Sequence, residues 1–222
     1  MIIFNLKTYP TTTGKMFVET AEDIIQAISD IPAIQDHVYV CPTQTDLSKA
    51  VLDFPELNII AQHVDFMSSG KTTGWTPVEV LKDLGVEMTL LNHSEHRAAS
   101  IELLKEHVKF VQNSGIKVLV CCENINEAEL LLEAEPYAIS YEPAHLIGTG
   151  KSLTREMPEA VTEFVDLVKN KALPIIGAGI ADGEDVKAGV ELGGKGFLIA
   201  SRFAKADDKV SKTKEFVSVY TD

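Results

Sequence analysis

Short apolar segments alternate with longer amphipathic segments along the whole chain, and this alternation is the feature that most limits its fold. We interpret the short apolar segments as buried strands. They cover residues 2–4, 37–41, 57–61, 88–91, 117–122, 137–141, 173–176 and 196–199. Strands that alternate with helices in this way predict a parallel sheet covered by helices, and therefore an α/β fold.

The number of strand–helix units narrows the fold further. Eight units without a break in composition predict a single domain, residues 1–222, folded as a closed (β/α)8 TIM barrel. An open doubly wound sheet is the structural alternative, and it would usually carry a GxGxxG motif after the first strand. The first strand is instead followed by Asn5-Leu6-Lys7. Because 45% of the 222 residues are hydrophobic, the chain can build a sizeable core.

Charge and composition exclude several classes of partner. The formal net charge of −13 at pH 7 argues against nucleic acid, because phosphate backbones require a basic protein face. No apolar run approaches the roughly 20 residues that span a bilayer, so we expect no membrane partner. The three cysteines, Cys41, Cys121 and Cys122, form no CxxC motif and lie in strand-like runs. They predict buried free thiols and a cytoplasmic location.

Several polar or glycine residues directly follow predicted strands. They are Asn5, Lys7, His93, Glu95, Glu142, Gly179 and Ser201. In a barrel, the C-terminal ends of the strands meet on the face that carries active sites. Taken alone, Lys7 is better explained as a solvated surface lysine and Glu95 as an acid in the first turn of a helix, and a histidine bonded to backbone is an alternative for His93. Their convergence on one rim favours a functional site.

The segment from Tyr141 to Gly150 carries the most distinctive chemistry. A buried strand places Glu142 at its C-terminal end, and Pro143 biases Glu142 away from helical geometry. The glycines of Gly148-Thr149-Gly150 allow the backbone to approach a ligand closely. The segment therefore predicts a carboxylate base, a mobile lid over residues 143–150 and a phosphate cradle. An exposed glutamate in a surface turn is the alternative.

Taken in order along the whole chain, these motifs resemble those of triosephosphate isomerases, and more closely the short archaeal-type form of that family. The most specific carriers are Asn92-His93-Ser94-Glu95-His96-Arg97 and Tyr141-Glu142-Pro143 with Ile147-Gly148-Thr149-Gly150. The others are Asn5-Leu6-Lys7, Ala61-Gln62-His63-Val64-Asp65, Gly177-Ala178-Gly179-Ile180 and Ala200-Ser201. The short glycine motifs are less specific, since many phosphate-binding barrels share them.

The resemblance implies an enzyme that interconverts dihydroxyacetone phosphate and D-glyceraldehyde 3-phosphate through an enediolate, in glycolysis and gluconeogenesis. It assigns Glu142 as the base, His93 and Lys7 as electrophiles, Asn5 as the neighbour of Lys7, and Glu95 as the acid that supports Lys7. It assigns phosphate and substrate binding to Asn5, Leu6, Lys7, Ile147, Gly148, Gly179, Ala200 and Ser201. The reaction is proton transfer only, so we expect no cofactor and no metal.

Further expectations concern protonation and assembly. We expect His93 to open a helix, whose positive N-terminal end would disfavour an imidazolium ion. The resemblance implies that Thr73 reaches a neighbouring subunit, giving a homodimer at least and a homotetramer in the archaeal-type form. The sequence departs from the family pattern at His96, where the family usually has arginine, and at Ala144-His145 in the lid.

Two other functions remain open at this point. One is a different phosphate-binding barrel enzyme, such as an isomerase of aromatic amino-acid biosynthesis, which would lack the combination of His93-Ser94-Glu95 with Glu142-Pro143. The other is a catalytically silent barrel that serves as a binding protein. The presence of every residue that the resemblance assigns to catalysis argues against the silent barrel.

Overall fold

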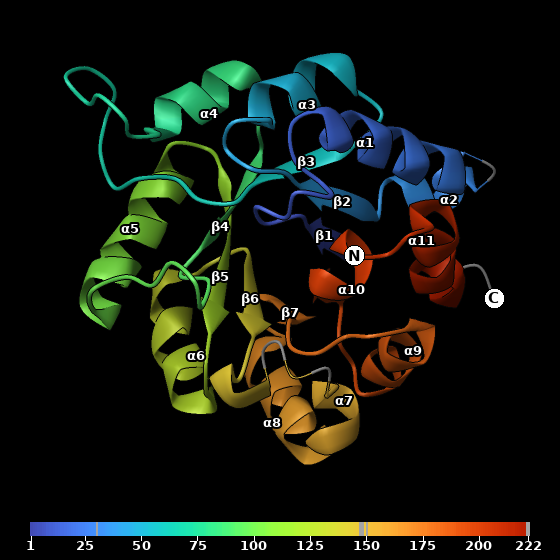
Figure 1. Ribbon diagram of the computed structural model, residues 1–222. Helices are drawn as coiled ribbons and strands as arrows, with labels where there is room; N and C mark the ends of the chain where they lie inside the picture. Colours follow the sequence, from blue (N-terminus) through green and yellow to red (C-terminus); the bar gives the residue numbers. More distant parts are fainter. Residues whose placement is uncertain (30, 147–148, 150, 221–222) are drawn as a thin grey trace.

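The computed structural model describes residues 1–29, 31–146, 149 and 151–220. Within these residues, eight parallel strands close into a barrel in sequence order, and β8 pairs with β1 (Figure 1). The strands are β1 (Ile2–Asn5), β2 (Val38–Cys41), β3 (Asn58–Ala61), β4 (Met88–Leu91), β5 (Lys117–Cys122), β6 (Ala138–Tyr141), β7 (Leu173–Ile176) and β8 (Gly196–Ile199). The predicted (β/α)8 barrel is confirmed, and no strand boundary differs from its prediction by more than one residue.

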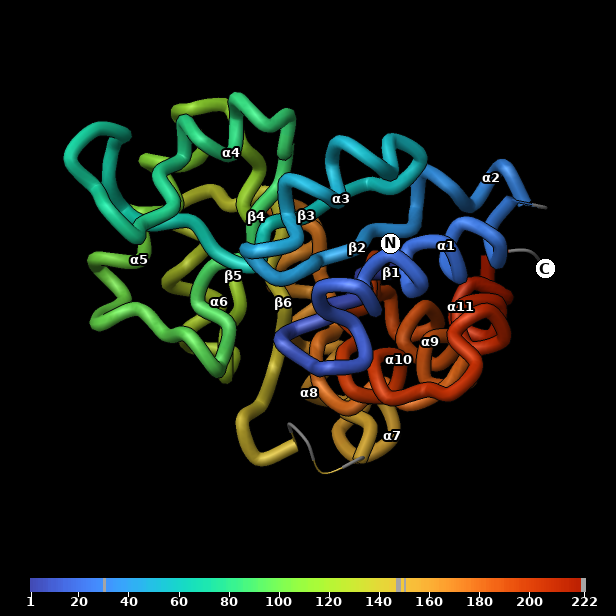
Figure 2. Tube along the Cα trace, turned by 45° about the horizontal axis from the view of Figure 1, so that its top comes forward, coloured from blue at the N-terminus to red at the C-terminus, as the bar shows by residue number. Residues whose placement is uncertain are grey.

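Helices surround the barrel and cover the outer face of every strand (Figures 1 and 2). The α-helices are α1 (Lys15–Ile28), α2 (Pro32–Gln35), α3 (Leu47–Asp53), α4 (Val78–Leu84), α5 (Ile101–Asn113), α6 (Ile125–Leu131), α7 (Leu153–Glu156), α8 (Pro158–Val168), α9 (Gly183–Glu191), α10 (Ser201–Ala204) and α11 (Lys209–Val217). Three 3-10 turns are present as well: η1 (Leu132–Ala134), η2 (Ala144–Leu146) and η3 (Ser218–Tyr220). None of the helices in the described ranges is long and apolar enough to cross a membrane.

Two apolar cores hold the barrel together. The inner core fills the barrel with side chains from alternate strand positions, such as Ile3, Ile60 and Leu119. The larger outer core lies between the strands and the helices and includes Phe4, Phe17 and other fully buried rings. Strands buried on both faces require near-continuous apolar runs, which explains why the strands were recognisable in the sequence.

Side-chain caps fix where several helices begin. The carboxylate or amide oxygens of Asp182 and Asn124 accept hydrogen bonds from backbone N–H groups in the first turns of α9 and α6, and Ser100 caps α5 in the same way. Each helix therefore starts a few residues after its strand ends. The intervening residues are free to form the loops at the C-terminal rim of the barrel.

One connection differs clearly from expectation. The sequence predicts a last helix from about Ala206 to Tyr220, whereas the structure has α10 directly after β8 and α11 only from Lys209. Asp208 caps α11 by accepting a hydrogen bond from the N–H of Ser211 at 2.8 Å. The segment 205–208 turns the chain between α10 and α11. Ser201 is therefore the first residue of a separate short helix, α10.

The loop between β3 and α4 stands away from the barrel in both views (Figures 1 and 2). It carries two large exposed apolar side chains, Phe66 and Trp75. Exposed rings of this size in an otherwise polar loop indicate a contact surface.

Candidate active site

The strand-end residues singled out in the sequence lie on one rim. Asn5 ends β1, and Glu142 directly follows β6. His93 lies two residues after β4, and Ala200 follows β8. Because all strands of the barrel are parallel, these C-terminal ends share one face. Leu6 is the exception in this group, since its side chain is buried in the outer core and only its backbone can face a ligand.

Glu142 is buried, with 2% of its surface exposed. Its backbone N–H donates to the carbonyl of Cys122 at 2.8 Å, which extends the β5–β6 pairing by one residue. Its Oε1 accepts a hydrogen bond from the Ser140 hydroxyl at 2.9 Å. Burial, and next the charge of Glu142, raises the pKa of the Cys121 thiol well above its usual value. The alternative of an exposed glutamate in a surface turn is therefore wrong.

His93 points its ring at this carboxylate. The distance from His93 Nε2 to Glu142 Oε2 is 3.5 Å. On the other side of the ring, Nδ1 accepts a hydrogen bond from the backbone N–H of Glu95 at 3.2 Å. An Nδ1 that accepts a hydrogen bond carries no proton, so the proton of the neutral ring lies on Nε2 and faces the site.

The expected helix start at His93 is wrong. His93 instead begins a tight turn in which the N–H of His96 donates to the His93 carbonyl at 2.7 Å, and α5 starts only at Ile101. Asn92 adopts a left-handed backbone with φ 61°, and its side chain donates to the carbonyl of Cys121 and accepts from the N–H of Ala98. These bonds hold the segment in a compact loop. A single peptide N–H, rather than a helix dipole, thus orients the imidazole.

Lys7 is held in an unusual backbone conformation. Its φ is 48°, in the left-handed region that non-glycine residues rarely adopt. The Asn5 side chain accepts from the Lys7 N–H at 3.1 Å, and the Gln62 side chain donates to the Lys7 carbonyl at 3.0 Å. The ammonium group then forms an ion pair with Glu95, with Nζ and Oε1 2.8 Å apart. Asn5, Lys7 and Glu95 therefore form one connected group.

The loop after β7 approaches the segment that follows residues 143–150. Gly179 has φ 69°, and a Cβ added there would collide with the backbone carbonyl oxygen of Lys151. The N–H of Leu153 also donates to the carbonyl of Ala178 at 3.2 Å. Ser201 opens α10 on the adjacent strand end. Ile147 and Gly148, which the resemblance assigns to phosphate binding, lie outside the described residues, as does Gly150.

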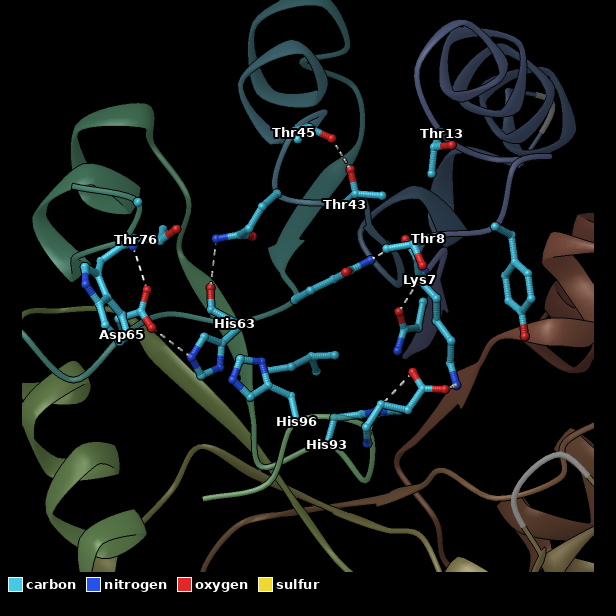
Figure 3. Close-up of a pocket in the computed structure, with 18 residues that line it drawn as sticks. Lys7, Thr8, Thr13, Thr43, Thr45, His63, Asp65, Thr76, His93 and His96 are labelled. Atoms are coloured by element: carbon cyan, nitrogen blue, oxygen red, sulfur yellow. Dashed lines mark hydrogen bonds and ion pairs between the residues drawn. The ribbon is translucent and has the colours of Figure 1, made fainter. Parts of the chain in front are cut away.

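A cavity of about 1030 Å³ opens beside this site (Figure 3). Asn5, Lys7, His93 and Glu95 line one edge of it, and the rest of its lining comes from the loops after β1 to β4, with threonines that include Thr13, Thr43 and Thr45. Glu142, Gly179, Ala200 and Ser201 do not line it. The cavity and the site at the strand ends therefore share only the edge formed by Asn5, Lys7, His93 and Glu95. From that edge the cavity extends toward Trp75.

Four residues to which the sequence assigned no part in catalysis belong to the site by contact. Gln62 bonds to the Lys7 backbone, Ser140 donates to Glu142, and Cys121 lies beside Ser140 in the register of β5 and β6. Gly177 leaves room for the base, because a Cβ there would lie 2.7 Å from Glu142 Oε1. The sequence carried a signal for Ser140, since residues two apart on a strand face the same way. The described residues contain no group of three or more His, Cys, Asp or Glu side chains arranged to hold a metal ion.

Comparison with known proteins agrees with the resemblance found in the sequence. A family model described as triosephosphate isomerase matches residues 1–219. The chain is 36% identical over 222 residues to the triosephosphate isomerase of Methanocaldococcus jannaschii, covering 98% of both chains. It is 33% identical over 218 residues to that of Thermoplasma volcanium, covering 97% of this chain and 98% of the relative. For Methanopyrus kandleri the identity is 34% over 221 residues, covering 98% and 96%. The chain belongs to the triosephosphate isomerase family.

Proposed function

We propose that this protein interconverts dihydroxyacetone phosphate and D-glyceraldehyde 3-phosphate by proton transfer through an enediolate. Membership of the family supports the reaction. The observation that supports the assignment of residues is the pairing of Glu142 with His93, whose Oε2 and Nε2 atoms lie 3.5 Å apart on the active face of the barrel. A carboxylate base and a hydrogen-bond donor that face one space are the two groups that this proton transfer requires.

Each group has a separate task in the reaction. Glu142 removes a proton from the carbon next to the substrate carbonyl, and negative charge develops on the carbonyl oxygen. His93 donates the Nε2 proton to that oxygen as a neutral imidazole. Lys7 adds a positive charge beside it. Glu95 pairs with the ammonium group, and Asn5 holds the Lys7 backbone by accepting a hydrogen bond from its N–H. No redox step or group transfer occurs, so the reaction needs no cofactor and no metal.

Backbone N–H groups provide the phosphate site in this proposal. The loop of Gly179 and the residues Ala200 and Ser201 lie after neighbouring strands, β7 and β8. The loops after the last two strands of a barrel often bind phosphate in this way. Ile147 and Gly148 complete the phosphate site by resemblance. In a chain with a net charge of −13, Lys7 also provides local positive charge that attracts an anionic substrate.

A coupled assay that follows glyceraldehyde 3-phosphate turnover by the purified chain tests the function. We expect Glu142→Gln to lower kcat by roughly 10²–10⁴-fold, the usual contribution of a general base. Glu163→Gln, an exposed acid on α8, is the matched control and should leave kcat unchanged. Turnover of another sugar phosphate in place of the triose would favour the second barrel enzyme, and an inactive but folded parent would favour the silent barrel.

We further propose a homo-oligomer, at least a dimer, in which the loop 68–74 of one subunit enters the cavity beside Lys7 of the other. The loop projects from the barrel, and Thr73 lies exposed near its end. The cavity is rich in threonine hydroxyls that can bond to a polar loop. The seven-residue helices α4 and α6 fit the short archaeal-type form, for which the resemblance implies a tetramer. The three free thiols support the cytoplasm as its location.

A further inference from the structure

We propose that Ser140 is a positioning residue for Glu142, and this inference rests on the proposed function. Ser140 lies on β6 two residues before Glu142, so both side chains point to the same side of the strand. That side is the interior of the barrel, because Ala138, two residues earlier, belongs to the inner core. Ser140 is fully buried there.

A hydroxyl at this position is chemically unusual. The neighbouring positions of the inner core carry apolar side chains, among them Leu119, Ala138 and Ile175. A buried hydroxyl is destabilising unless it forms a hydrogen bond. Among the described residues, the only hydrogen-bond partner of the Ser140 hydroxyl is Glu142 Oε1, at 2.9 Å. Alanine would fill the same space without a polar group, so the role of the hydroxyl is its bond to the carboxylate.

The bond divides the two oxygens of the carboxylate between two tasks. Ser140 holds Oε1 toward the barrel interior, while Oε2 faces His93 Nε2 at 3.5 Å. Cys121 stands beside Ser140 in the register of β5 and β6, and Gly177 leaves the remaining side open for the carboxylate. With Oε1 held, the carboxylate cannot rotate freely, and one defined oxygen is presented to the substrate.

The bond also favours the charged form of the base. A hydroxyl that donates to a carboxylate stabilises the ionised state over the protonated state. Glu142 must be ionised to accept the substrate proton, and the Ser140 bond keeps that carboxylate in one orientation. Loss of the bond should therefore lower kcat, which depends on the orientation of the base, and leave substrate binding nearly unchanged.

The test compares Ser140→Ala with Ser140→Cys in the full-length enzyme. We expect Ser140→Ala to lower kcat by roughly five- to tenfold while KM changes little, the effect of losing one hydrogen bond that orients the base. Ser140→Cys keeps a weak donor of similar size and should fall between the parent and the alanine variant.

Thr89→Val is the matched control. The Thr89 hydroxyl is also fully buried on a strand, but its hydrogen bonds within the described part of the chain go to the backbone carbonyls of Ala61 and Leu90. Its removal should lower stability and leave kcat at the parent value. The inference is overturned if Ser140→Ala keeps the parent kcat, or if Thr89→Val lowers kcat equally. If the alanine variant does not fold, the cysteine variant decides by the same criterion. An inactive parent would instead remove the proposed function, and this inference with it.

Discussion

At the scale of single residues, the site depends on one strained backbone position, Lys7, and one buried carboxylate, Glu142. Hydrogen bonds from neighbouring side chains hold both in place. Lys7 keeps a left-handed backbone because the Asn5 and Gln62 side chains bond to its N–H and carbonyl. Glu142 keeps a carboxylate in the barrel interior, where the Ser140 hydroxyl donates a hydrogen bond to its Oε1. Such arrangements cost free energy, and they persist only where the surrounding contacts determine them fully.

His107 gives a prediction about stability at low pH. Its ring is buried on α5 and stacks on Phe66 at 5.1 Å, and its Nε2 has no hydrogen-bond partner within the described residues. Burial, and next the neighbouring His63, lowers the pKa of His107 from 6.5 to about 4. The unfolded chain therefore binds this proton at a higher pH than the folded chain does. Stability should fall as the pH drops from about 6.5 to 4, by at most about 3 kcal/mol from this group.

Denaturant unfolding of His107→Gln measured between pH 7 and 4 checks this prediction. The variant should lose less stability over that range than the parent. Replacement of the exposed His37 in the same way provides the comparison and should keep the parent's slope. Equal slopes for the parent and His107→Gln would show that His107 does not titrate as described.

At the scale of elements, the loops after β6 and β7 depend on each other. Gly179 and the backbone of Lys151 touch, and Leu153 bonds to Ala178. Strand ends alone do not create this contact, since it joins two loops that the barrel places side by side. The proposed phosphate site therefore depends on the packing of one loop against another.

Gly179→Ala should disturb both loops. The added Cβ would meet the Lys151 carbonyl, and alanine would also have to adopt a positive φ. We expect a several-fold rise in KM, with stability lowered by roughly 1–3 kcal/mol. Gly115→Ala is the matched control. Gly115 also has a positive φ, +92°, but a Cβ added there would lie 4.0 Å from the nearest atom, Lys82 Nζ, and would cause no collision. It should lower stability alone. An unchanged KM in Gly179→Ala would remove Gly179 from the phosphate site.

The segment after Glu142 gives a second prediction at this scale. We propose that residues 143–150 cover the enediolate, which would otherwise expel its phosphate group. Deletion of Ala144–Leu146, which form η2, should leave the barrel folded, slow isomerisation and raise methylglyoxal release per turnover. Chromatographic measurement of methylglyoxal decides the matter. A slow deletion variant that releases no more methylglyoxal per product than the parent would exclude a protective role.

At the scale of the whole molecule, one residue reports on assembly. Trp75 is the single tryptophan of the chain, and 56% of its surface is exposed in the isolated subunit. It directly follows the loop 68–74 that we propose enters a partner subunit. Burial of an indole ring in an interface moves it to an apolar environment, so its fluorescence emission should lie at shorter wavelength in the oligomer.

Thr73→Arg should give a monomer with red-shifted Trp75 emission and lower kcat, because a charged side chain must enter a closely fitting interface. Light scattering and fluorescence at micromolar concentration measure both effects together. Glu159→Arg on the exposed face of α8 introduces the same side chain away from the loop, with a larger change in charge, and should stay oligomeric. A parent that is monomeric and fully active at this concentration would contradict the proposed assembly.

The sequence by itself determined the order of strands and helices and the strand ends that carry the site. This was possible because doubly buried strands must be apolar throughout, and a parallel barrel brings all C-terminal strand ends to one face. Glu142, Lys7 and His93 were therefore placed correctly on the rim before any contact was known. The cap of α9 could also be predicted from the sequence, since Asp182 accepts its hydrogen bond from Asp185, only three residues further along the chain.

Only the tertiary structure decided how these residues are held. The Lys7–Glu95 pair joins positions 88 residues apart, and no local pattern encodes such a contact. The turn at His93 replaced the expected helix because Asn92 bonds across to β5 and forward to Ala98. The burial of Glu142 against Ser140 and Cys121 required the register of β5 and β6. Closure of the barrel sets these distances, and closure involves all eight strands at once.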